Sequence, residues 1–332
     1  MDLQDSAFER CWAVSADRAG SRVDAFLRAQ LPFLSRREVE DALGERYFFV
    51  NGRRARKGDR VAKGDVVQFT GPAAWLFPAP IPNPRLAVPV LYEDGHLLAL
   101  NKPAGIDCHG FSGRDDDSLA NFLVARWPAL SGIGKSRWEP GLVHRLDRET
   151  SGVVLIAKTQ AAFDDLRRQF GRRAVKKTYL ALVWGSTEAE GTISFSLAHD
   201  PDDKRKMQAM VAPGRRGPKR KVWPALTHYR KVGEGRGLSL LELEMKTGVT
   251  HQLRAHLAAV AHPILGDVLY GAGRQETFGL RRHFLHAAAM QFMHPASKSS
   301  LMLKAPLPAE LSTVLVRLRL ISGLGQLGCA IK

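Results

Sequence analysis

Cysteine is scarce in this sequence: the 332-residue chain contains Cys11, Cys108 and Cys329, at wide and irregular spacing. An odd, scattered set excludes a disulfide framework and a cysteine metal site, and is typical of a reducing compartment. The chain also lacks a run of about 18 apolar residues, so no segment is predicted to span a membrane. The acidic, polar N-terminus, MDLQDSAFERCW, is unlike a secretory signal. We therefore expect a cytoplasmic protein.

Acidic residues are in deficit. The chain has 33 Asp and Glu against 49 Lys and Arg, a formal net charge of +16. A surplus of that size repels itself unless an anionic partner offsets it, and nucleic acid or an anionic membrane surface would serve. No basic helix with a Trp or Leu face is evident, which favours nucleic acid and argues against a membrane partner.

The length predicts about two domains. In the first, over residues 19–70, apolar spacing indicates a helix over 22–31, and Ser35 with Glu38 forms a capping box for a second helix. A strand over 47–50 then leads into a hairpin turn at Asn51-Gly52, and 66–69 closes a small sheet. Two helices followed by VNGRRARKGDRVAKGD resemble the RNA-binding domain first described in the fourth protein of the small ribosomal subunit. Its expected phosphate contacts are Arg36, Arg37, Arg53 and Arg54.

The remaining boundaries follow from composition. Residues 1–18 are expected to form an N-terminal tail and 321–332 a C-terminal tail. Residues 71–85 are rich in proline, which favours an extended connector over helix or central strand. Residues 86–320 are expected to form the catalytic domain.

Asp147 lies in the stretch around which the chain is organised, GLVHRLDRETSGVVLIAK over 141–158. Residues 153–157 read as a buried strand, so Asp147 is expected in a loop between two buried segments. A partly desolvated carboxylate there needs a cation or hydrogen-bond donors. An isolated Asp in such a loop would usually bond its own backbone in a turn.

The nonamer HRLDRETSG, however, resembles the active-site motif of the RluA-type pseudouridine synthases. This resemblance implies that Asp147 is the catalytic nucleophile and that His144 and Arg145 contact the substrate. His144 itself favours the RluA type, because a related family has Gly there. Arg145 is the candidate to fill the gap that an extruded uridine leaves in the RNA.

Hairpins and alternating strands dominate the second domain. Strands are expected over 90–94, 97–100, 153–157, 175–183, 226–232 and 238–245, and helices over 118–127 and 160–170. This pattern predicts an α+β protein with a mixed, largely antiparallel sheet and flanking helices, preceded by the small α+β RNA-binding domain. The family resemblance, which covers about 86–310, implies the same fold.

Two further segments resemble family signatures. KKTYLALV implies that Tyr179 stacks on the target base and assists proton removal, although most strand tyrosines are only half-buried sheet residues. TGVTHQLRAHLAAVAHPILGD implies that Arg254 pairs with Asp147, on a helix capped by Thr250. The family more often has Arg where Val249 stands.

Other polar residues have more ordinary readings. Lys102, in NKPAG, contacts phosphate or is a plain surface lysine. His251 and His256 are five residues apart without an acid between them, so no metal site is expected. His286 is expected to be structural. The basic segment 199–221 is either a solvated insertion or a clamp on the RNA backbone.

Pseudouridine formation detaches uracil from ribose and rejoins it through carbon, without redox change or net hydrolysis. The resemblance therefore implies an isomerase without metal or organic cofactor, and the paired domains imply large-subunit ribosomal RNA, with transfer RNA as the alternative. A non-catalytic RNA-binding protein, or a glycoside-type hydrolase with Glu149 as its second carboxylate, are the competing classes. No obligate protein partner is indicated, so a monomer is expected.

Overall fold

The computed structural model describes residues 7–32, 34, 36–72, 79–110, 115–211, 221–271 and 276–320. The chain forms two compact units. One comprises residues 1–81 with 110–116, and the other residues 82–109 with 117–332. Within the described ranges, no helix combines the length and apolarity needed to cross a membrane.

The first unit packs two helices on a four-stranded antiparallel sheet. The helices are α1 (Val23–Gln30) and α2 (Arg36–Gly44), beside the one-turn helix η1 (Ala16–Arg18). The strand order is β1 (Ala7–Ala13), β4 (Val66–Pro72), β2 (Phe48–Val50), β3 (Arg53–Arg54). Phe26, Leu27, Phe48 and Phe69 form the centre of its core. The predicted helices, strands and hairpin are present, and Asn51 and Gly52 both have the positive φ that a two-residue type I′ turn requires. Ser35, the proposed cap, lies outside the described residues.

The first strand is a correction to the sequence analysis. Ala7–Ala13 pairs along its length with β4, so this part of the expected tail over 1–18 belongs to the sheet. Phe8 and Trp12 pack on the core from alternate positions, which is the period of a strand. β4 also continues through Pro72, so the expected connector begins later than residue 71. Pro72 is tolerated because it lies at the end of the strand.

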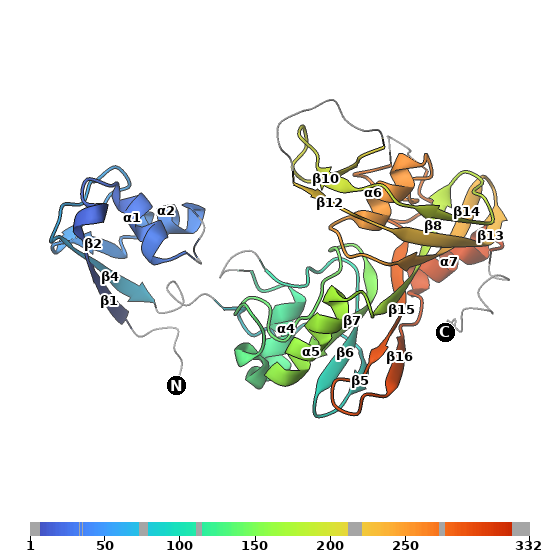
Figure 1. Ribbon diagram of the computed structural model, residues 1–332, viewed down its shortest axis with the longest axis horizontal. Coiled ribbons are helices and arrows are strands. Elements are labelled where there is room, and N and C mark those ends of the chain that lie inside the picture. The colour runs from blue at the N-terminus through green and yellow to red at the C-terminus, as the bar shows by residue number, and fades with distance from the viewer. Residues whose placement is uncertain are drawn as a thin grey trace. The chain divides into compact units, whose positions relative to one another are not determined.

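A nine-stranded sheet forms the frame of the second unit (Figure 1). Its path is β5, β6, β7, β15, β8, β14, β13, β9, and β16 pairs with β15. Every neighbouring pair is antiparallel except β7 with β15. The strands are β5 (Val90–Glu93), β6 (Leu97–Lys102), β7 (Ser151–Ala157), β8 (Lys176–Trp184), β9 (Glu190–Ile193), β13 (Thr227–Gly235), β14 (Leu238–Met245), β15 (Leu285–Met293) and β16 (Ser300–Lys304).

Both faces of β7 are buried, as its unbroken apolar sequence predicts. Val153 and Leu155 pack in one core with α5 (Gln160–Gly171), whereas Val154 and Ile156 pack in the other with α4 (Leu119–Arg126). The second core also takes in α6 (Gln252–Ala259) and α7 (Ala309–Leu318). The one-turn helix η2 (Pro128–Gly132) follows α4. The sheet thus carries helices on both faces, which fixes the loops at its strand ends.

A small second sheet comes from the basic segment and its flanks. Its strands are β10 (Leu197–His199), β11 (Met207–Ala209) and β12 (Val222–Trp223). The middle of the basic segment, 212–220, lies outside the described residues. The α+β class with a largely antiparallel sheet is confirmed, and the strands and helices predicted over 90–245 are present with small shifts at their ends.

Candidate active site

Asp147 lies in the loop that enters β7. The backbone N–H of Leu146 donates to Cys108 Sγ at 3.2 Å, and that of Thr150 donates to the Asp147 carbonyl at 3.0 Å. At the end of the loop Gly152 has a φ of 122°, and a Cβ there would lie 2.2 Å from the Ala287 carbonyl oxygen. Only glycine lets β7 approach β15 so closely. The loop therefore holds Asp147 in a fixed place, with its side chain 24% exposed.

Lys102 is a correction to the sequence analysis. Its side chain is fully buried, and Nζ donates to the carbonyl oxygens of Pro103, Ile106 and Arg148, at 2.7 to 2.9 Å. An ammonium whose donors are used in this way is neither a surface group nor able to meet a phosphate. Burial lowers the pKa of Lys102 to about 8. Its place is beneath the active-site loop, where it joins the turn after β6 to the residue that follows Asp147.

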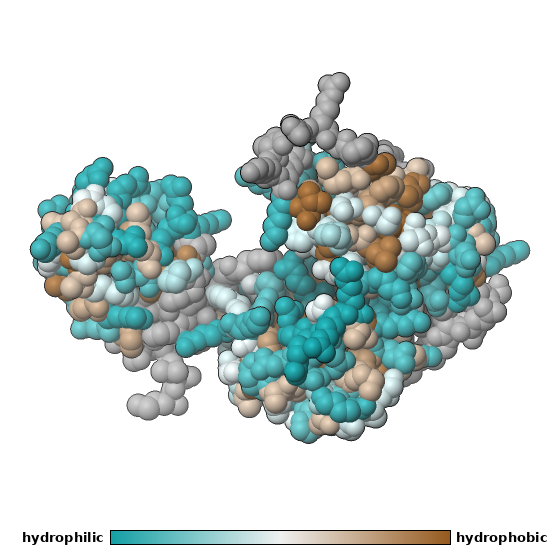
Figure 2. All heavy atoms as spheres, viewed as in Figure 1, coloured by the Kyte–Doolittle hydropathy of each residue, from teal (hydrophilic) through white to brown (hydrophobic). Residues whose placement is uncertain are grey.

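A cleft of about 580 Å³ opens above the loop. Among the described residues that line it, Asp147 is the single acid. The lining cations are Arg145, Arg167, Arg173, Lys177, Lys246 and Arg254. In the space-filling view of the second unit, hydrophilic side chains gather across the middle of the visible face (Figure 2). A cleft whose described lining has six cations and one acid favours a polyanionic ligand.

Arg254, on α6, bridges two carboxylates. Its Nη1 lies 3.2 Å from Asp147 Oδ2, as the sequence analysis expected of this pair. Its Nε and Nη2 bind Asp267 in a two-pronged contact at 2.7 and 2.9 Å. The Asp267 side chain is fully buried. Although burial opposes ionisation, the hydrogen bonds and charge of Arg254 lower the pKa of Asp267. Asp267 thus fixes the guanidinium, and the guanidinium faces Asp147.

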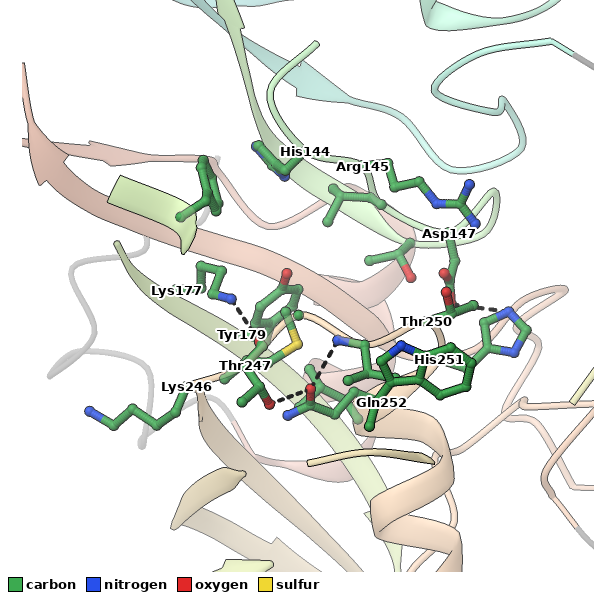
Figure 3. Close-up of a pocket in the computed structure, with 18 of the residues that line it drawn as sticks. His144, Arg145, Asp147, Lys177, Tyr179, Lys246, Thr247, Thr250, His251 and Gln252 are labelled. Atoms are coloured by element: carbon green, nitrogen blue, oxygen red, sulfur yellow. Dashed lines mark hydrogen bonds and ion pairs between the residues drawn. The ribbon is translucent and has the colours of Figure 1, made fainter. Parts of the chain in front are cut away.

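Tyr179 lies on β8 in the floor of the cleft. Its side chain is 5% exposed, and it faces the same space as Asp147 (Figure 3). Burial and the nearby charge of Asp147 raise the pKa of Tyr179. The phenol is therefore neutral at ordinary pH.

His144 and Arg145 differ in their surroundings. The His144 ring stacks on Phe170, and its Nε2 accepts the backbone N–H of Leu155 at 2.9 Å. Burial lowers the pKa of His144 to about 3, which keeps that nitrogen an acceptor. His144 thus lines the cleft while it supports β7. The Arg145 side chain is exposed at the cleft, with Nη1 3.5 Å from His109 Nε2.

The four arginines predicted to bind phosphate in the first unit, Arg36, Arg37, Arg53 and Arg54, are exposed. Arg36 forms an ion pair with Glu40, and Arg54 donates to the Gly44 carbonyl. Both retain donors for a phosphate, since a guanidinium has five.

Three residues in or behind the cleft were missed by the sequence analysis: Lys177, Asp267 and Tyr270. Lys177 donates to the Thr247 carbonyl at 2.7 Å inside the cleft. The Tyr270 ring lies 5.0 Å from the Arg254 guanidinium carbon. Asp267 follows the short apolar run Ile264-Leu265 and Gly266 in the sequence. An acidic residue directly after such a run was the one hint in the sequence that its carboxylate is buried and needs a partner.

The α6 terminus is a further correction. The residue at the N-cap is His251, not Thr250, and its φ of 53° is left-handed. His256 is buried and bonds Thr227 and the Phe195 carbonyl. Across the described ranges, no three His, Cys, Asp or Glu side chains are grouped to hold a metal ion.

Two buried histidines lie behind the loop. His286 Nε2 faces the Ala305 carbonyl at 3.2 Å, and its Nδ1 lies 2.9 Å from Ser151 Oγ. The carbonyl requires a proton on Nε2, so Nδ1 accepts the hydroxyl proton of the serine. His283 Nε2 lies 2.8 Å from Thr150 Oγ1. These bonds are made by neutral rings, as expected for a structural His286.

Acidification is expected to destabilise the protein through these histidines. Burial lowers the pKa of both His283 and His286 from 6.5 to about 4. Between those values the unfolded chain binds protons that the folded chain cannot, so the free energy of unfolding falls as pH drops from 6.5 to 4. The loss is roughly 3 kcal/mol for each histidine. Urea unfolding at pH 7, 5.5 and 4 measures it.

The control separates these rings from general charge effects. His286→Gln should lower stability at pH 7 yet flatten its fall toward pH 4. The control is the same substitution at His96, which is exposed and lies outside the buried pair. If the free energy of unfolding of His286→Gln fell with pH as steeply as that of wild type, His286 would not be a source of the acid destabilisation.

Comparison with known protein families gives two matches. Residues 96–259 match the family model described as RNA pseudouridylate synthase, and residues 21–67 match the S4 domain. The first range contains Asp147, Tyr179 and Arg254. The second contains Arg36, Arg37, Arg53 and Arg54, the four arginines predicted to bind phosphate.

Individual proteins are similar over most of the chain. An uncharacterized RNA pseudouridine synthase of Chloroflexus aurantiacus is 39% identical, over 94% of this chain and 95% of that protein. Ribosomal large subunit pseudouridine synthase D of Xylella fastidiosa is 34% identical, over 95% and 94%. Among solved structures, human RNA Pseudouridylate Synthase Domain Containing 4 has a TM-score of 0.56 at 28% identity, over 69% of this chain and 92% of that one.

Proposed function

This chain belongs to the RNA pseudouridine synthase family, isomerases that convert uridine to pseudouridine in RNA, and we propose that its substrate is large-subunit ribosomal RNA. Several relatives over nine-tenths of the chain carry the name ribosomal large subunit pseudouridine synthase D, which supports that substrate. The S4 domain and the net charge of +16 also fit a large, structured RNA.

One observation carries the chemical assignment: Asp147 is the single carboxylate among the described residues that line a cationic cleft, and an arginine lies on one of its oxygens. Detaching uracil and rejoining it through carbon requires one carboxylate at the sugar–base junction. In the proposed mechanism, Asp147 reacts as nucleophile or base, and Arg254 keeps it ionised and aimed. Tyr179 lies against the detached ring and assists removal of the carbon-bound proton.

The uridine must leave the base stack before it can react. Extrusion into a pocket is the general solution for enzymes that act on a base. In our proposal the cations around the cleft hold the neighbouring phosphates, and Arg145 fills the space that the uridine vacates. Arg145 suits this role because its side chain is exposed beside Asp147.

A glycoside-type hydrolase would need a second carboxylate facing the same bond. Glu149, the formal candidate, is absent from the described cleft lining. This favours the isomerase over the hydrolase at this site.

The direct experiment is an assay of the purified protein on large-subunit ribosomal RNA and on bulk transfer RNA. Tritium release from RNA labelled at uridine C5, followed by mapping of the product, identifies both activity and substrate. We expect release from the ribosomal RNA at a small number of sites. Release from transfer RNA alone would contradict the proposed substrate, and release of free uracil would indicate hydrolysis.

The S4 domain is expected to supply docking and not chemistry. Replacing Arg36, Arg37, Arg53 and Arg54 together with Ala should weaken binding to large ribosomal RNA fragments. The slope of log affinity against log salt should become shallower by roughly 3, because up to four phosphate contacts are lost. The turnover number on a short stem-loop should stay within about 3-fold.

The matched control is Arg28→Ala with Lys63→Ala, two exposed cations of the same unit. Because it removes two charges and not four, it should change the salt slope by less than half as much as the quadruple variant does. Equal effects would mean that the charge acts without regard to its position.

A further inference from the structure

The Arg254 and His251 side chains both approach the same oxygen of the Asp147 carboxylate. Arg254 Nη1 lies 3.2 Å from Asp147 Oδ2, and His251 Nε2 lies 3.7 Å from that atom. Oδ1 takes part in neither contact. Figure 3 shows the His251 ring turned toward the Asp147 carboxylate at one side of the cleft, away from Lys177. The surroundings thus distinguish the two oxygens of a chemically symmetric group.

The backbone at His251 is strained. A φ of 53° is uncommon for a residue with a side chain, and such strain gathers at functional sites. The His251 carbonyl accepts the backbone N–H of Ala255 at 2.9 Å, whereas the His251 side chain makes no capping hydrogen bond to α6. The imidazole lies beside Asp147 instead, and the side chain is 18% exposed.

A chain of polar contacts runs from the Met207 backbone through the Tyr270 hydroxyl to the His251 ring. The backbone N–H of Met207 donates to Tyr270 Oη at 2.7 Å, so the hydroxyl is free to point its own proton elsewhere. His251 Nδ1 lies 3.1 Å from that oxygen. If the hydroxyl donates to Nδ1, the neutral ring carries its proton on Nε2, which is the atom that faces Asp147.

The ring stays neutral and in place for further reasons. Burial lowers the pKa of His251, against the opposing effect of Asp147. Tyr270 lies edge-on to it and also covers the Arg254 guanidinium. The loop Asp267–Tyr270 thereby holds both groups that meet Asp147 Oδ2.

We propose that His251 is a positioning residue for Asp147, resting on the function proposed above. Its Nε2–H donates to Oδ2 together with Arg254, and Oδ1 is left as the atom that meets the uridine. The contact of 3.7 Å shortens to a hydrogen bond when RNA closes the cleft, since such bonds are often long in the free enzyme. Tyr270 sets the tautomer.

The test compares two amides at residue 251. His251→Gln places an N–H near the position of Nε2, whereas His251→Asn reaches only to the Nδ1 position and tolerates the left-handed backbone. Single-turnover rates with saturating enzyme separate chemistry from binding. We expect His251→Asn to lower the rate about 10- to 100-fold at unchanged RNA affinity, and His251→Gln to retain most of the rate.

Tyr270→Phe removes the hydroxyl that selects the tautomer. It should lower the rate by a smaller factor, about 3- to 10-fold, again without loss of RNA affinity. This variant leaves residue 251 intact. If His251→Asn fails to fold, as judged by loss of its native melting transition, Tyr270→Phe therefore still tests the positioning role of His251.

Three results would overturn the inference: a wild-type rate in His251→Asn, equal losses in the Asn and Gln variants, or a wild-type rate in Tyr270→Phe. An assay of the wild-type protein on the same RNA distinguishes failure of the His251 role from failure of the proposed function. If wild type forms no pseudouridine, the function fails; if wild type is active and the variants match it, only the role of His251 fails.

Discussion

Replacing Asp147 with Asn is expected to abolish pseudouridine formation, with a loss on the order of 10⁴-fold or more. The amide has nearly the shape of the carboxylate but neither its charge nor its nucleophilicity. The folded state should persist, because the side chain is 24% exposed and lies at the cleft. Affinity for RNA should be kept or slightly increased, since a negative charge is removed from a lining whose described residues include six cations. Product mapping and filter binding measure the two quantities.

Glu149→Gln is the matched control, because it makes the same chemical change two residues along the same loop. It should keep near-normal turnover. Clear residual activity in Asp147→Asn, or an equal loss in Glu149→Gln, would remove Asp147 from its proposed role.

Arg254→Ala is expected to cost both turnover and stability. It leaves the fully buried carboxylate of Asp267 without its cation, and a buried charge stripped of its partner typically costs about 3–5 kcal/mol. Activity should fall by at least about 100-fold, because Asp147 loses the group that aims it. Urea unfolding at pH 7 and single-turnover assays measure the two effects.

The double variant separates the two effects. Adding Asp267→Asn to Arg254→Ala removes the stranded charge, so much of the stability should return while activity stays low. Arg254→Lys keeps the charge but not the two-pronged geometry. Its stability and its activity should both lie between those of wild type and those of Arg254→Ala. A stable and active Arg254→Ala would refute the ion-pair role.

Local patterns in the sequence were sufficient for most of the fold. The Asn51-Gly52 turn, the apolar run at 153–157 and the spacing of Phe163 and Leu166 each carry their structure within a few residues. The pairing of Asp147 with Arg254 was predicted from a family resemblance, and not from the spacing or chemistry of the residues themselves. They are 107 residues apart, and no local pattern joins them.

The residues that were missed or misread depend on tertiary surroundings. Lys102 reads as polar, yet its three carbonyl partners come from two separate turns, which only the fold brings together. The role of Asp267 is evident only from its ion pair with Arg254, and that of His251 only from its contact with Tyr270. The strand at Ala7–Ala13 was hidden because its sequence, AFERCWA, lacks a regular apolar alternation, and its pairing with β4 joins residues about 60 positions apart.

The place of β15 between β7 and β8 has a consequence for biosynthesis. β7 and β8 follow each other along the chain but meet only through β15, which comes more than 100 residues after β8 has ended. A nascent polypeptide therefore exposes one open edge of β7 and one of β8 until β15 has been synthesised, and such edges invite aggregation. The closure of β7 on Ala287 also seats the Asp147 loop, so truncated products should lack a formed catalytic centre altogether.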